Sequence, residues 1–225
     1  SFVTLGGPVT LRTEWPESAE RILDAADRLL ARFGYRKMTV DDLAKEAGIG
    51  KGTVYLSFEA KSDVALACID RMVARLLGRL QAIADGLGSP DRRLRDMLVE
   101  RVMHRFDYAR PHSASLDELL ASIRPRLLAH RQEYFHAEAR VLASVIDEGR
   151  RHHGFDVADP AAAARAFVTA SNALLPYSLS VEELGRRGEI LRRADEIAHL
   201  LLRGIVAGPR TARRRPGGAQ KRIRR

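Results

Sequence analysis

The amino-acid sequence predicts an all-α fold. Apolar residues recur at three- and four-residue steps, glycine and proline separate the segments, and no stretch alternates like a half-buried strand. The 225 residues are 45% apolar and 30% charged, and they show no self-similarity at a period of about 20–50 residues. This composition excludes collagen-like chains, disulfide scaffolds and disordered polymers, and it leaves a globular protein with enough material for a core.

The sequence also limits where the protein works. No apolar run reaches the roughly 18 uncharged residues of a membrane span, and the first residues lack the pattern of a secretion signal. The single cysteine, Cys68, has apolar neighbours and no possible internal partner, which predicts a buried structural thiol. We therefore expect a cytoplasmic protein that does not bind membranes.

Most of the formal net charge of +9 lies at the C-terminal end. Residues 208–225 contain eight Arg or Lys residues and no acid, so the rest of the chain carries about +1. Proline and glycine interrupt this basic segment, and it has little apolar surface to bury, so we expect a disordered tail. Residues 1–15 are expected to form a flexible arm.

The first predicted helix begins at Pro16-Glu17, where proline loses no needed donor and glutamate favours the positive helix end. We expect it to end at Phe33, with Gly34 supplying a left-handed stop. Its residues at three- and four-residue steps predict one apolar stripe that faces the core: Ile22, Ala26, Leu29, Leu30 and Phe33.

Two short helices are predicted next. The first of them starts at Val40, because Thr39 and the carboxylate three residues later resemble a reciprocal capping arrangement, and it ends at Gly48. The other runs from Lys51 to about Phe58.

The rest of the chain predicts further helices whose limits are set largely by proline. They are expected near residues 62–85, 91–108, 115–122, 125–130, 131–152, 159–178 and 188–206. The prolines that set boundaries are Pro90, Pro111, Pro125, Pro160 and Pro176.

The two short helices on either side of Ala47-Gly48-Ile49-Gly50 have the layout of a helix-turn-helix, whose second helix enters the DNA major groove. The segment RILDAADRLLARFGYRKMTVDDLAKEAGIGKGTVYLSFEAKSDVALA resembles the DNA-binding domain of the TetR (tetracycline-repressor-like) transcriptional regulators, over roughly residues 17–70. This resemblance implies a DNA-binding domain at 16–62, with the helix-turn-helix at about 40–58, and a larger helical ligand-binding and dimerisation domain at 63–207.

The resemblance also implies which residues contact DNA. They line the groove or its phosphates, or they anchor the DNA backbone from either side: Thr39, Lys51, Gly52, Thr53, Tyr55, Leu56, Ser57 and Lys61. Their chemistry suits these roles, because Thr39 adds a hydroxyl to a helix N-terminus, Gly52 allows close backbone approach and the Tyr55 hydroxyl can donate. Lys51 could instead bind guanine.

Simpler explanations exist for the same residues. Tyr55 could only pack against its neighbours, and the lysines could be ordinary solvated side chains. Three acids near the proposed surface oppose DNA binding, and they would otherwise form a solvated acidic face: Asp41, Asp42 and Glu46. Two departures from the family pattern also stand out. Gly50 replaces a frequent Ser or Thr, and Leu56-Ser57 replaces a frequent aromatic residue or His.

For the C-terminal domain, the resemblance implies a small-molecule effector and a homodimer formed through the last two long helices. Candidate effector-binding residues lie on the helices that would enclose a cavity: Met103, Phe106, Asp107, Tyr134, Phe135, Phe167, Asn172 and Tyr177. Core packing is the alternative for the apolar and aromatic members of this set, and only Asp107 and Asn172 offer polar recognition.

The sequence nominates no catalytic residue, no metal site and no cofactor. The glycine-rich segment 48–53 lacks the spacing of a phosphate-binding loop, because Lys45 stands where a glycine is needed and Gly52 where a hydroxyl is needed. The histidines lack paired metal-ligand spacing. We therefore do not expect an enzyme.

These observations predict a ligand-responsive transcriptional regulator. We expect a repressor that binds a palindromic operator in double-stranded DNA as a homodimer and is released by a small-molecule effector of unknown identity. The alternative is a sequence-indifferent DNA-coating protein driven by the basic tail. When bound to DNA, the protein would be associated with the nucleoid.

Overall fold

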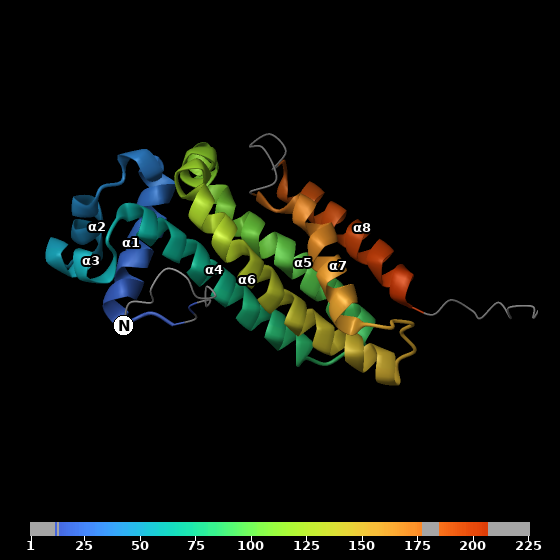
Figure 1. Ribbon diagram of the computed structural model, residues 1–225. Helices are drawn as coiled ribbons and strands as arrows, with labels where there is room; N and C mark the ends of the chain where they lie inside the picture. The colour runs from blue at the N-terminus through green and yellow to red at the C-terminus, as the bar shows by residue number, and fades with distance from the viewer. Residues whose placement is uncertain (1–11, 13, 177–184, 207–225) are drawn as a thin grey trace, which may run out of the picture.

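The protein is all-helical, as predicted. The computed structural model describes residues 12, 14–176 and 185–206. The helices are α1 (Glu17–Lys37), α2 (Val40–Ala47), α3 (Lys51–Ser57), α4 (Lys61–Ala84), α5 (Pro90–Ala109), η1 (Arg110–Ser115), α6 (Leu116–His152), α7 (Pro160–Ser171), η2 (Asn172–Leu174) and α8 (Arg187–Ile205). Figure 1 shows α1–α3 gathered at one end of an elongated bundle formed by α4–α8.

Several sequence-based expectations fall on other parts of the chain. The basic tail, Tyr177 and nearly all of the predicted arm lie outside the described residues. Within those residues, no helix combines the length and the apolar character needed to cross a membrane.

α1 runs past its predicted stop at Gly34. This glycine has φ 77° and ψ 170°, so the helix changes direction there and then continues for one short turn to Lys37. Phe33, the last residue before the kink, is 52% exposed, and Tyr35, just after it, is buried. The prediction that Phe33 completes the inward stripe is therefore wrong, because the backbone after Gly34 brings Tyr35 into the core at this end of α1.

The limits of α2 and α3 agree with the sequence. Thr39 and Asp42 form the expected reciprocal cap: the Asp42 amide donates to the Thr39 hydroxyl oxygen at 3.1 Å, and the Thr39 amide donates to the Asp42 carboxylate at 3.1 Å. Gly48 ends α2 in the left-handed conformation, at φ 64° and ψ 40°. Arg21 of α1 donates to the Ala47 carbonyl oxygen at 2.7 Å, which fixes the end of α2 against α1.

α4 belongs to two hydrophobic cores. The first core joins it to α1–α3 and includes Val64 and Cys68. The second core, which it shares with α5–α8, includes Leu76, Leu80 and Ala84. Because the helix is continuous between these residues, α4 connects the two cores directly, and a displacement of α4 in one core also displaces it in the other. The proposed domain boundary near 62/63 lies at the start of this helix and stays a prediction.

α6 is one continuous helix of 37 residues, where the sequence predicted three shorter helices and a boundary at Pro125. Proline removes the hydrogen bond of its own nitrogen, and its ring crowds the carbonyl group of Ala121, four residues earlier. Ala121 is exposed, so this carbonyl group can bind water instead. Leu119 and Ile123 are buried in the core of α1–α3, and this packing holds the helix together on the N-terminal side of the proline.

α7 starts at its predicted cap and ends earlier than predicted. The Asp159 carboxylate accepts from the Ala161 and Ala162 amides at 2.9 and 3.0 Å. The helix gives way to η2 after Ser171, whereas the sequence predicted a helix to residue 178. Leu175 is extended, with ψ 144°, as expected for a residue that precedes a proline.

The backbone at Gly34 makes a testable prediction. We expect Gly34→Ala to lower the free energy of unfolding by about 1–3 kcal/mol, because its φ and ψ lie where side chains are strained. In the matched control, Gly78→Ala, the added methyl has no heavy atom within 4 Å on an exposed turn of α4. The control should raise the free energy of unfolding by about 0.5–1 kcal/mol. Urea denaturation measures both, and equal effects would contradict the prediction.

Candidate nucleic-acid interface and cavity

The residues predicted to contact DNA lie at the start of α2, on α3 and at the start of α4. These three elements are neighbours at the α1–α3 end of the molecule (Figure 1). α3 is held by Val54 and Phe58, which are buried in the first core. The opposite side of α3 is open: Tyr55 is 50% exposed and Leu56 is 86% exposed. A large apolar side chain so fully in solvent contributes nothing to the core, so α3 presents a surface that is free to contact a partner.

The rest of the predicted set divides by exposure. Thr39, Lys51 and Gly52 are exposed, while Thr53 and Ser57 are half-buried. A Cβ atom on Gly52 would meet no heavy atom within 4 Å, so the backbone there is accessible to a large group such as a phosphate. The Ser57 hydroxyl donates to the Thr53 carbonyl oxygen at 3.2 Å, a bond within the helix.

Each of the three acids near this surface already has a partner. Asp42 forms the cap of α2, and this hydrogen bonding with Thr39 lowers the pKa of its carboxyl group. Glu46 accepts from Arg28 at 2.6 Å. Asp41 lies 2.8 Å from the Lys51 ammonium group, and their hydrogen bond raises the pKa of Lys51. The acidic residues are therefore local counterions, which weakens the objection that they oppose DNA binding.

Lys61 is engaged elsewhere. Its ammonium group donates to the carbonyl oxygens of Tyr35, Arg36 and Met38 at 3.2–3.3 Å, and it lies 4.6 Å from the centre of the Tyr35 ring. These contacts fix the start of α4 against the end of α1. Its predicted role as a DNA anchor stays a prediction, because a phosphate would have to compete with these carbonyl groups.

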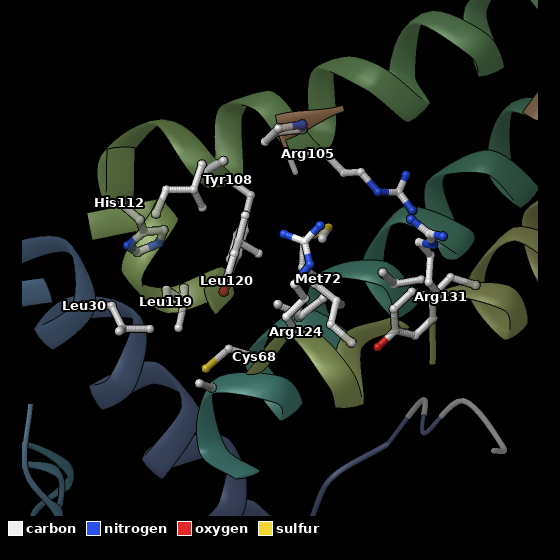
Figure 2. Close-up of a pocket in the computed structure, with 18 of the residues that line it drawn as sticks. Leu30, Cys68, Met72, Arg105, Tyr108, His112, Leu119, Leu120, Arg124 and Arg131 are labelled. Carbon is white, nitrogen blue, oxygen red and sulfur yellow. The ribbon is translucent and has the colours of Figure 1, made fainter. Parts of the chain in front are cut away.

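A cavity of about 120 Å³ lies where α1, α4, α5 and α6 meet (Figure 2). Its lining is mainly apolar and includes one residue of α1, Leu30. The other lining residues are Ala65, Cys68, Ile69, Met72, Val73, Arg105, Tyr108, Ala109, His112, Leu116, Leu119, Leu120, Arg124, Leu127, Leu128, Arg131, Tyr134, Phe135 and Pro176.

Two of the predicted effector-binding residues line this cavity, Tyr134 and Phe135. The other described candidates are not part of the lining. Met103, Phe106 and Phe167 are buried in the hydrophobic cores, as the core-packing alternative anticipated.

The two polar candidates, Asp107 and Asn172, form hydrogen bonds with arginines and do not line the cavity. Asp107 pairs with Arg187 at 2.8 and 2.9 Å, and this hydrogen-bonded ion pair lowers the pKa of its carboxyl group. Asn172 accepts from Arg101 at 2.6 Å. The residues chosen from the sequence are therefore spread over more of the bundle than this cavity occupies, and their role in effector binding stays a prediction.

A buried cation joins α1 to the bundle beside the cavity. The side chain of Arg71 is 3% exposed, and its guanidinium group binds Glu20 at 2.6 Å and Asp24 and Asp27 at 2.8 Å. The other Asp27 oxygen accepts from the Tyr108 hydroxyl at 2.7 Å. Tyr108 lines the cavity, so its wall is hydrogen-bonded directly to α1.

The sequence analysis missed this network, although the sequence carries a signal for it. Glu20, Asp24 and Asp27 recur at four- and three-residue steps, so they share one face of the first helix. Arg71 lies four and three residues after the apolar Ala67 and Cys68, on a helix face where a solvated arginine is unexpected. No local rule pairs the two features, because α1 and α4 meet only in the folded chain.

Cys68 is buried, as expected, and its Sγ atom lies 3.8 Å from the Leu23 carbonyl oxygen. Burial raises the pKa of this thiol, which makes it a poor nucleophile. Over residues 12, 14–176 and 185–206, His, Cys, Asp and Glu side chains form no group of three or more that could hold a metal ion.

Comparison with known proteins agrees with the geometry. Residues 22–68 match the family model described as bacterial regulatory proteins, tetR family. The chain is 27% identical over 118 residues to the uncharacterized HTH-type transcriptional regulator YerO of Bacillus subtilis, covering 52% of this chain and 39% of that protein. It is 38% identical over 84 residues to the HTH-type transcriptional regulator EthR of Mycobacterium tuberculosis, covering 36% of this chain and 39% of that protein.

The likeness extends to solved structures. A TetR transcription regulator from Haloarcula marismortui has a TM-score of 0.66 and 20% identity, covering 86% of this chain and 100% of that chain, which shows a shared fold. The matches to YerO and EthR span 39% of those two proteins. Residues 22–68 therefore form a helix-turn-helix domain of the tetR family, and the chain has the fold of a TetR transcription regulator.

Proposed function

We propose that the protein is a repressor that binds a palindromic operator as a homodimer and releases it when a small molecule occupies the cavity. The observation that carries this proposal is the position of the cavity. Its lining includes Leu30 of α1, and Tyr108 on its wall is hydrogen-bonded to Asp27 of the same helix. A molecule that enlarges or fills this space acts on the helix that supports α2 and α3.

The proposed domains are a DNA-binding domain over 16–62 and a ligand-binding and dimerisation domain over 63–207. Thr39 and the exposed residues of α3 would contact the operator. Among the predicted effector-binding residues, Tyr134 and Phe135 would contact the ligand, because they line the cavity.

The outer surfaces of α7 and α8 support the proposed dimer. Ala162, Ala166 and Ala170 lie four residues apart and are exposed on α7. Leu191 and Leu200 are 38% and 68% exposed on α8. Small residues allow close helix approach, and exposed leucines gain free energy when a second copy covers them. A two-fold dimer would present two copies of α3 to the two halves of a palindrome.

The proposed mechanism is a coupling free energy between the cavity and the operator surface. The ligand would favour a position of α4, and with it of α1–α3, in which the two copies of α3 are wrongly spaced for the operator. DNA must then weaken ligand binding by the same factor by which the ligand weakens DNA binding.

The proposal predicts a specific DNA sequence. Selection of bound duplexes from fragments of the source genome at ~150 mM salt should enrich an inverted repeat with half-sites about one helical turn, or a multiple of it, apart. On that duplex we expect Lys51→Ala to weaken binding about tenfold, since it removes a contact to a phosphate or a guanine. Tyr55→Phe should weaken binding through loss of its hydroxyl.

Fluorescence anisotropy of a labelled duplex gives both affinities, and circular dichroism checks that each variant is folded. Enrichment without a common sequence would contradict the repressor and favour sequence-indifferent coating of DNA. Unchanged affinity in both variants would mean that α3 does not contact the operator.

The ion pair between Asp41 and Lys51 predicts an opposite effect. We expect Asp41→Asn to tighten binding to the selected duplex about twofold to fivefold, because an exposed pair of this kind contributes about 0.2–1 kcal/mol that DNA must otherwise replace. The same anisotropy titration at two salt concentrations measures it. Weaker binding in the variant would show that Asp41 itself supports the interface.

The hydrogen bond from Tyr108 to Asp27 predicts how the two parts communicate. We expect Tyr108→Phe to weaken operator binding severalfold in the absence of any effector, because α1 is released from the cavity wall. The lost bond to a charged group should also lower the free energy of unfolding by about 1.5–3 kcal/mol.

Tyr134→Phe is the matched control. Its hydroxyl also lines the cavity and donates to a carboxylate, but that carboxylate is Asp70 of α4 and not a residue of α1. A similar loss of stability with nearly unchanged operator affinity is expected. Equal weakening of operator binding by the two variants would contradict a specific role for the bond to α1.

A further inference from the structure

We propose that the cavity takes an amphipathic organic anion, with an apolar body among α1, α4, α5 and α6 and an acidic group paired with Arg124. This inference rests on the proposed function, because it names the class of ligand for the same cavity. It is carried by the chemistry of the lining and by the position of one guanidinium group.

The body of the ligand follows from the walls. The part of the cavity nearest α1 is bounded by apolar groups such as Leu30, Cys68 and Leu119, all buried. The two phenol hydroxyl groups in the lining already donate to carboxylates, Tyr108 to Asp27 and Tyr134 to Asp70. Few polar groups are therefore left to recognise a polar body, and an apolar one gains from leaving water.

The charged groups in the lining have one sign. Arg105, Arg124 and Arg131 contribute guanidinium groups, and among the described residues of the lining there is no aspartate or glutamate. Burial lowers the pKa of His112, and Asp27 only partly offsets this, so the imidazole is neutral at pH 7. A cationic ligand would meet only repulsion here, whereas an anion would be attracted by every charged group.

Arg105 and Arg124 differ in whether their charge is already neutralised. Arg105 is buried and pairs with Glu138, a carboxylate that also binds Arg101. Although burial alone would raise it, Arg105 and Arg101 hold the pKa of Glu138 below its usual value, so this counterion is ionised. The shared carboxylate therefore fixes the position of Arg105. Because one carboxylate pairs with two guanidinium groups, a net positive charge remains beside the cavity.

Arg124 has no such counterion. It lies on the exposed side of the lining, and within the part of the chain that the structure describes it makes no ion pair or side-chain hydrogen bond. Figure 2 shows its guanidinium group directed into the space between the lining helices. Two residues along α6, Arg126 points elsewhere and pairs with Asp63. An acidic group at Arg124 would form a charge-assisted and potentially bidentate contact.

The arrangement therefore separates the two ends of a ligand. The apolar end enters toward Leu30 and α1, where it can affect the helix that supports α2 and α3. The acidic end stays near the exposed side of the cavity, where Arg124 stabilises it and water still reaches it. A neutral ligand of the same shape would leave the guanidinium group hydrated and would gain no charge-assisted contact with it.

Three probes of one chain length test the charge. We would titrate the full chain with decanoate, 1-decanol and decylamine at pH 7.5 by isothermal titration calorimetry, below the concentration at which each aggregates. Decanoate should bind at least about tenfold more tightly than 1-decanol, and decylamine should bind most weakly. Equal affinities for the three, or no binding of decanoate, would overturn the proposal.

Matched variants test the residue. Arg124→Met keeps the length of the side chain and should weaken decanoate about tenfold while leaving 1-decanol unchanged. Arg124→Lys, which keeps the charge, should restore much of the affinity. Arg140→Met removes an exposed arginine of α6 that does not line the cavity, and it should change nothing. An equal loss in Arg124→Met and Arg140→Met, or no loss in the former, would overturn the role of Arg124.

A second readout separates this inference from the proposed function. The operator duplex is titrated with and without saturating decanoate. Selective decanoate binding that depends on Arg124 supports the inference even if operator affinity does not change, and in that case the ligand-controlled repressor is contradicted for this class of ligand. Release of the operator by 1-decanol as well as by decanoate, with equal affinity, supports the repressor and overturns the inference.

Discussion

The burial of one arginine between three carboxylates underlies the arrangement of the molecule. Arg71 of α4 can give up water only because Glu20, Asp24 and Asp27 of α1 surround its guanidinium group. If α1 moved away, a buried charge would lose its partners at a cost of several kcal/mol. This constraint fixes α1, and with it α2 and α3, at one position along α4, so the helix-turn-helix and the bundle behave as connected parts.

The cavity gains its importance from this connection. It lies beside the Arg71 cluster, and Tyr108 extends the same hydrogen-bond network to the cavity wall. Burial raises the pKa of Tyr108 far above its usual value, so it stays a hydrogen-bond donor at every physiological pH. A molecule in the cavity can thus compete with, or reinforce, contacts that position α1, and no long pathway through the bundle is needed.

Short-range ion pairs neutralise much of the charge on the exposed surface around α3. Asp41 and Glu46 hold Lys51 and Arg28 in fixed positions at little net charge. Any affinity for DNA must therefore come from the placement of individual groups on α3. The exposed Leu56 adds apolar surface that a thymine methyl group could cover. Such a surface favours recognition of a particular sequence over simple attraction to phosphates.

Features that depend on near neighbours along the chain could be predicted from the amino-acid sequence. The cap formed by Thr39 and Asp42, the left-handed Gly48 and the burial of Val54 follow from residues within one or two turns, and so does the all-α class. Tertiary structure decided the rest. Packing of α6 against α1 carried a helix through Pro125, and the kink at Gly34 brought Tyr35 into the core. The cavity and the Arg71 cluster were also beyond the sequence, because their groups lie on helices far apart in the chain that meet only after folding.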